Sequence, residues 1–95
     1  MSAPNSREIY QCLRDAALGV QALEVHEHLS DGRVRVQIGH WQLILTLDDE
    51  GLAHCSECRA PDGREAERGH WQRYGTDPVE LLSVWERTQL ERLLG

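Results

Sequence analysis

The stretch that decides the fold runs from Leu23 to Leu47 and reads LEVHEHLSDGRVRVQIGHWQLILTL. Two tight-turn signals divide it into three segments in which apolar and polar residues alternate. Asp31-Gly32 is typical of a two-residue type I′ hairpin, and Gly39-His40 has glycine where a type II′ turn requires it. Alternation with a period of two between tight turns predicts three antiparallel strands.

Each turn also predicts a strand register. The first turn would pair Leu29 with Val34 and Val25 with Ile38, and the second would pair Ile38 with Trp41. With Glu27 as the exception, both registers gather on one face the apolar side chains that we expect to be buried: Leu23, Val25, Leu29, Val34, Val36, Ile38, Trp41, Leu43, Leu45 and Leu47. The opposite face would be exposed to water and carries Glu24, His26, His28, Arg33, Arg35, Gln37, Gln42, Ile44 and Thr46.

A fourth strand is predicted from Leu52, and its register has two solutions. If Leu47 pairs with Leu52, the side chains that point to the buried face are His54, Ser56 and Cys58. If a bulged loop pairs Asp48 with Leu52, they are Ala53, Cys55 and Glu57. We favour the first register because it buries Leu52. In a regular strand, Cys55 and Cys58 would lie on opposite faces.

Helices are predicted at both ends of the chain. Ser6 is a suitable N-cap for the first helix, which would end at Gly19 and whose apolar residues recur with helical spacing: Ile9, Cys12, Leu13, Ala16 and Ala17. Asp77 and Ser83 each precede a further helical segment, at about 78–82 and 84–94. The residues expected to cover the sheet from there are Leu81, Leu82, Trp85, Leu90, Leu93 and Leu94. After a turn at 60–63, residues 64–75 have no clear period, and we expect a loop or short irregular helix anchored by Trp71 and Tyr74.

Together these elements predict one small α+β domain spanning residues 1–95. Its order would be an N-terminal helix, a four-stranded antiparallel meander and a C-terminal helical segment, with the helices packed on one sheet face. A chain of 95 residues is near the lower end of what buries a self-sufficient core, so dimerisation could add stability.

The composition argues against several functions. Sixteen acidic residues against ten basic ones give a net charge of −6, whereas a nucleic-acid partner usually needs a basic face. Lysine is absent, which removes Schiff-base chemistry and a P-loop lysine. No apolar run approaches the roughly 18 residues that span a bilayer, and the N-terminus does not resemble a signal peptide. We therefore expect no membrane partner and a cytoplasmic location, where the three cysteines stay reduced.

The pair Cys55-x-x-Cys58 has three interpretations. A redox dithiol should begin a helix, but a turn follows Cys58. A zinc site would need both sulfurs to converge and would take further ligands from His54 or His70. The third interpretation, which we favour, is two structural thiols at the end of a strand. No other cofactor is indicated, and no signature places a nucleophile beside a histidine and a carboxylate.

Three segments of the chain resemble a family of short uncharacterised proteins from proteobacteria. They are Cys55-Ser-Glu-Cys-Arg-Ala-Pro-Asp-Gly-Arg64, Gly75-Thr-Asp-Pro-Val-Glu-Leu-Leu82 and Leu90-Glu-Arg-Leu-Leu94, with a weaker likeness over Ile9 to Gly19. The resemblance lies mainly in the C-terminal half. It implies a small stand-alone protein and carries over no catalytic or binding residue.

The incomplete catalytic signatures and the small core lead to one functional expectation. We expect a non-enzymatic protein-binding or regulatory domain that acts through a protein partner or as a homodimer. The alternative is a zinc-binding protein that uses Cys55 and Cys58 with His54 or His70.

Overall fold

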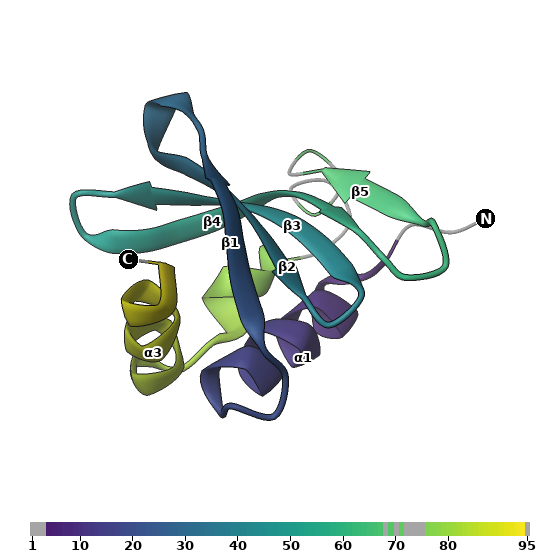
Figure 1. Ribbon diagram of the computed structural model, residues 1–95, viewed down its shortest axis with the longest axis horizontal. Helices are drawn as coiled ribbons and strands as arrows, with labels where there is room; N and C mark the ends of the chain where they lie inside the picture. The colour runs from purple at the N-terminus through teal and green to yellow at the C-terminus, as the bar shows by residue number, and fades with distance from the viewer. Residues whose placement is uncertain (1–3, 68, 70, 72–75, 95) are drawn as a thin grey trace.

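The computed structural model describes residues 4–67, 69, 71 and 76–94 and has an α+β fold (Figure 1). Helix α1 spans Ser6–Ala17, and the strands are β1 (Leu23–His28), β2 (Arg33–Ile38), β3 (Trp41–Asp48), β4 (Gly51–Arg59) and β5 (Glu65–Glu67). Two 3-10 turns, η1 (Ser30–Gly32) and η2 (Pro78–Leu81), and the C-terminal helix α3 (Val84–Leu94) complete the described elements. The sheet order is β1-β2-β3-β4-β5, with every neighbouring pair antiparallel.

The prediction of four strands is therefore wrong, because the sheet has five. The predicted turn at 60–63 forms, with the Gly63 N–H bonded to the Ala60 carbonyl at 3.0 Å and Gly63 at a φ of 91°. This turn sends the chain back along β4 and pairs β5 with its last three residues. Three residues are too short a run to show a period of two, so the sequence pattern did not reveal this strand. Trp71 is buried, as expected of an anchor, whereas Tyr74 lies outside the described residues.

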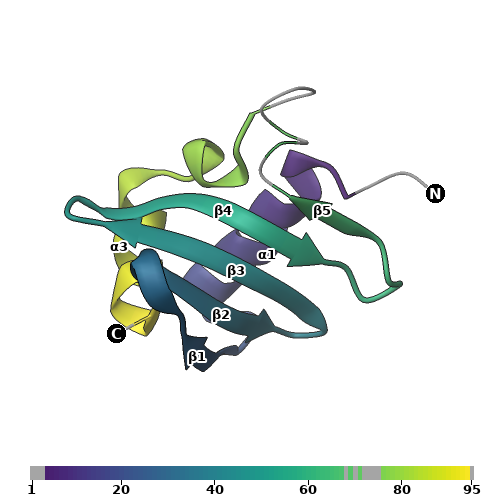
Figure 2. The ribbon, with the colours of Figure 1, turned by 90° about the horizontal axis from the view of Figure 1, so that it is seen from above.

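The domain has two layers (Figures 1 and 2). Helices α1 and α3 and the η2 turn lie on one face of the sheet, and the core fills the space between the layers. Its buried residues from the sheet include Val34, Val36, Ile38, Leu43, Leu45, Leu52, Cys55 and Cys58. No described helix covers the other face, which we call the open face. None of the described helices is long and apolar enough to cross a membrane.

The Gly39-His40 hairpin confirms the predicted register, with Ile38 opposite Trp41 and Gly39 at a φ of 59°. The Asp31-Gly32 turn also forms, with φ of 64° and 75° at its two residues. The register that it was expected to impose is nevertheless wrong, because Val25 faces Val36 and not Ile38.

Extra residues in β1 explain this shift. The N–H of Leu29 bonds to the Arg33 carbonyl at 2.7 Å, and the register changes again between Val25 and Glu27. Such bulges move the following side chains to the other face of a strand. Glu27 consequently stands opposite Arg35 on the open face, which removes the one buried charge in the predicted pattern, and His28 takes a place on the helix side.

In β4, Leu47 pairs with Leu52, as in the favoured register, and Leu52 is buried. Two register shifts follow along the strand. As a result, Cys55 lies opposite Leu45 and Cys58 opposite Leu43, so both cysteines point into the core. The expectation that they occupy opposite faces is wrong, because the extra residue Ser56 breaks the pleat between them.

The C-terminal segments have the predicted bounds within one residue, and Asp77 caps η2. Before α3, the side chains of Ser83 and Glu86 bond reciprocally to each other's backbone N–H. At the first helix, the predicted cap is wrong by one residue. Asn5, and not Ser6, accepts the Glu8 N–H at 2.8 Å, and Glu8 bonds back to the Asn5 N–H. The capping box thus uses the amide side chain one position earlier.

Three of the six apolar residues expected to cover the sheet from the C-terminal segments do not do so. Leu82, Leu90 and Leu94 are buried, but the exposed fractions of three others are large: Leu81 43%, Trp85 53% and Leu93 45%. The buried stripe of α3 is formed by residues four apart, Glu86, Leu90 and Leu94. Glu86 is tolerated there because its carboxylate forms an ion pair with Arg14 at 3.4 Å.

Candidate functional site

Three of the four residues predicted as zinc ligands lie among the described residues, and His54 is on the other side of β4 from the two cysteines. Cys55 and Cys58 lie in the core, whereas His54 stands opposite Thr46 on the open face. His70 lies outside the described residues. Across residues 4–67, 69, 71 and 76–94, no group of three or more histidine, cysteine, aspartate or glutamate side chains is placed to hold a metal ion.

The three thiols belong to the core. Cys12 of α1 joins Cys55 and Cys58 of β4 beneath the sheet, and all three are free and buried. Burial raises the pKa of Cys12 and of Cys58 to about 12, and it raises that of Cys55 well above its ordinary value. A thiolate is the strong nucleophile and metal ligand, and the raised pKa values favour the protonated form of these thiols at neutral pH.

Asp77 connects the η2 turn to β4. Its Oδ1 accepts hydrogen bonds from the backbone N–H of Val79 at 2.9 Å and of Cys55 at 3.3 Å. Burial raises the pKa of Asp77, and the two hydrogen bonds oppose that rise. The sequence pattern identified the capping role, but the bond to Cys55 spans 22 positions and left no local signal.

The open face consists of rows of side chains that face each other across the strands. From β1 to β5 the central row contains Glu27, Arg35, Ile44, Glu57 and Glu67. The row beside it contains Glu24, Gln37, Gln42, Arg59 and Glu65, and on the other side lie Arg33, Thr46 and His54. This face is therefore polar and of mixed charge, with Ile44 as the one apolar member of the three rows.

Two adjoining hollows mark the open face. One, of about 520 Å³, is lined by residues of β2 to β5 that include Arg35, Ile44, Glu57, Arg59 and Glu67. The other, of about 430 Å³, is lined by residues that include Arg33, Thr46, His54, Glu57 and Glu67. Glu57 and Glu67 border both hollows. The two hollows therefore form one continuous surface across the sheet.

Exposed apolar side chains also occur on the C-terminal helical segments. We define the outer helical surface by its exposed apolar side chains, which are Leu81, Val84, Trp85 and Leu93. Val84 is 83% exposed and borders a hollow of about 390 Å³ between α3 and the β3–β4 turn.

Comparison with known proteins shows a family and no function. No curated protein and no solved structure matches the chain. A family model described as "Domain of unknown function (DUF7693)" matches residues 4–95, which includes both halves of the chain. A match over nearly the whole chain shows membership: the protein belongs to this family of domains of unknown function.

Proposed function

We propose that this protein is a non-enzymatic protein-binding domain whose contact surface is the outer helical surface. One observation carries the proposal: Leu81, Val84, Trp85 and Leu93 are all more than two-fifths exposed on one short segment. Scattered exposed apolar residues are ordinary in proteins, but a group that contains tryptophan is typical of a protein interface. The C-terminal helical segments thus expose apolar side chains as well as burying others against the sheet.

Trp85 is the expected anchor of this contact. Tryptophan is enriched among the interface residues whose removal costs most binding energy, because its large ring buries much apolar area. The occupant is either a second copy of this chain or another protein. A small core that gains stability by association is consistent with both.

Light scattering after gel filtration tests the proposal with the variant Trp85→Ala. Thr88→Ala is the matched control, because Thr88 is exposed on the same helix and its hydroxyl bonds only to the Val84 carbonyl. If the domain is a homodimer, Trp85→Ala should raise its dissociation constant by about tenfold or more, and Thr88→Ala should leave it unchanged.

If the purified protein is a monomer, affinity capture from the native cell replaces the dimer measurement. A specific partner should then be captured by the Thr88→Ala variant and lost with Trp85→Ala. A protein that is a monomer up to millimolar concentration and loses no captured partner on Trp85→Ala would overturn the proposal.

The proposal includes a cytoplasmic location and excludes nucleic acid as a partner. Three free buried thiols suit a reducing compartment. The three described rows of the open face contain no phenylalanine, tyrosine or tryptophan, on which sheet proteins that bind single-stranded nucleic acid commonly stack bases.

Zinc binding through Cys55 and Cys58 is the alternative function. In its favour, both side chains point to the same side of β4. Elemental analysis of protein purified without an affinity tag tests whether the protein binds zinc. About one equivalent of zinc that is lost in Cys58→Ala would establish the alternative, and less than about a tenth of an equivalent, with no rise in melting temperature on adding zinc, would remove it.

A further inference from the structure

The central row of the open face has an unequal distribution of charge. Arg35 is drawn toward the β1 edge, where its guanidinium forms an ion pair with Glu27 at 3.3 Å. Glu57 and Glu67, directly opposite each other on β4 and β5, form no ion pair with any described residue. Two like charges facing each other across a strand pair destabilise a sheet. The fold therefore tolerates an unfavourable contact at this position.

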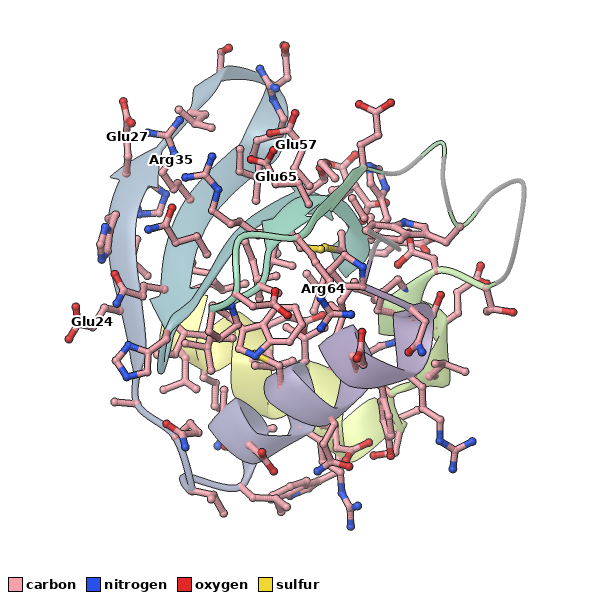
Figure 3. All side chains as sticks on the ribbon, turned by 90° about the vertical axis from the view of Figure 1, so that its right-hand side faces the viewer. Glu24, Glu27, Arg35, Glu57, Arg64 and Glu65 are labelled. Carbon is pink, nitrogen blue, oxygen red and sulfur yellow. The ribbon has the colours of Figure 1, made fainter. Side chains whose placement is uncertain are left out.

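Two neighbouring arginines among the described residues, Arg59 and Arg64, are already paired. Arg59 lies beside these glutamates but bonds Glu65 through two nitrogens, at 2.7 and 3.0 Å. Arg64 turns to the other side of the β4–β5 hairpin and reaches Asp62 and Glu8. Figure 3 shows Arg35 beside Glu27 and Arg64 next to α1. A further positive charge beside Glu57 and Glu67 would complete the central row.

The residues around Glu57 also indicate the shape of the side chain that could bind there. Ile44 faces Glu57 across β3 and β4, and both line the hollow of about 520 Å³. An apolar residue next to an unpaired carboxylate suits a side chain with an aliphatic stem and a cationic end. Arginine and lysine have this form, and a guanidinium can bond carboxylates through two parallel N–H groups.

We propose that the open face binds an extended basic segment of a partner protein, with an arginine or lysine between Glu57 and Glu67 and its stem on Ile44. Charge complementarity favours a cation, and the shape favours a protein segment. The two adjoining hollows cross the sheet, and their charged walls are exposed, so the surface is too open to enclose a small molecule in the way that a ligand pocket does. The surface is separate from the outer helical surface, and the inference does not depend on the proposed function.

Fluorescence anisotropy with a labelled eight-residue peptide of alternating arginine and serine tests this binding at 150 mM salt. The double variant Glu57→Gln/Glu67→Gln should weaken binding by about tenfold or more, because both charge-assisted bonds are lost. The matched control is Asp49→Asn/Glu50→Gln in the β3–β4 turn. It changes the net charge by the same amount at exposed residues away from the central row, and binding should change less than about twofold.

Three further arms complete the test. Ile44→Ser should weaken binding with no change in charge, and Trp85→Ala should leave it intact, which separates this surface from the outer helical surface. Circular dichroism and urea unfolding verify that each variant is folded. Equal losses in the two charge variants would show only attraction to an acidic protein and overturn the proposal. It would also be overturned if the wild-type protein does not bind the peptide, or if spermidine binds as tightly as the peptide does.

Discussion

Glu91 of α3 accepts a hydrogen bond from the backbone N–H of Leu52 at 2.8 Å, across 39 positions of the chain. The bond attaches the end of the β3–β4 hairpin to the C-terminal helix. At the neighbouring Gly51, the φ of 114° disfavours other residues, and a Cβ would have to displace the Glu91 carboxylate. The turn and the helix therefore hold each other in register.

We expect Glu91→Ala to lower the free energy of unfolding by about 1–2 kcal/mol, because it leaves the Leu52 N–H without its acceptor. Glu91→Gln keeps an acceptor oxygen and should cost less. Urea unfolding measures both, with Gln89→Ala on the same helix as the control. Equal unfolding midpoints for Glu91→Ala and the control would show that the bond does not contribute to stability.

The N-cap of α1 gives a second prediction. Asn5→Ala removes the acceptor of the Glu8 N–H and should destabilise the domain by about 1 kcal/mol. Ser6→Ala should change stability much less, by a few tenths of about 1 kcal/mol, because Ser6 is the first residue of the helix and not its cap. A larger loss in Ser6→Ala than in Asn5→Ala would restore Ser6 as the cap.

Alkaline pH should destabilise the fold through the buried thiols. Burial raises the pKa of Cys12 and Cys58 to about 12 from an ordinary 9.0, so the folded state holds these protons more tightly than the unfolded chain. Their stabilisation is complete below pH 9 and is lost as the pH rises toward 12, by about 1.4 kcal/mol per pH unit for each thiol.

Unfolding in urea at pH values from 8 to 11 measures this loss. Cys12→Ala removes one titrating group, so the free energy of unfolding should fall less steeply with pH in this variant. Titrating groups that both proteins share change the two slopes equally, so their effect cancels in the comparison. The same slope in both proteins would show that the Cys12 thiol is not shielded as the fold implies.

The contribution of Asp77 to stability should also fall as the pH rises, but in a lower pH range than that of the thiols. Because burial raises its pKa above 3.8, the folded state favours the protonated form, and this contribution to stability is lost as the pH rises from 3.8 through the raised pKa. Asp77→Asn keeps an acceptor oxygen for Val79 and Cys55 but does not titrate. Its stability relative to the wild-type protein should therefore increase between pH 3.5 and 7.

Asp77→Ala is the companion variant. It removes the acceptor for both N–H groups and should cost about 1–2 kcal/mol at neutral pH. The two variants separate the charge of Asp77 from its hydrogen bonds. If Asp77→Asn is as damaging as Asp77→Ala at pH 7, the negative charge itself is what the site requires.

Sequence patterns located most elements but not the side chains that form the candidate surfaces. The caps at Asp77 and Ser83 predicted the two C-terminal segments because capping depends on residues only three apart. The same local pattern placed Trp85 against the sheet, where the structure exposes it. The apolar residues of α3 do not form one stripe, because Glu86 holds the buried position one turn before Leu90, so the periodicity does not identify the buried side. Contact with α1 and the sheet decides that.

By itself, the sequence determined the α+β class, the antiparallel meander from β1 to β4, the register of the Gly39-His40 hairpin and, to within about one residue, the bounds of the helices. These features follow from turn chemistry, caps and alternation, which act between residues close in the chain. Only the tertiary structure decided the fifth strand, the shared side of Cys55 and Cys58, and the row that brings Glu57 opposite Glu67. Each depends on a bulge or on a long-range pairing. A single extra residue in a strand reverses the face of every side chain after it, and no local pattern records where that residue falls.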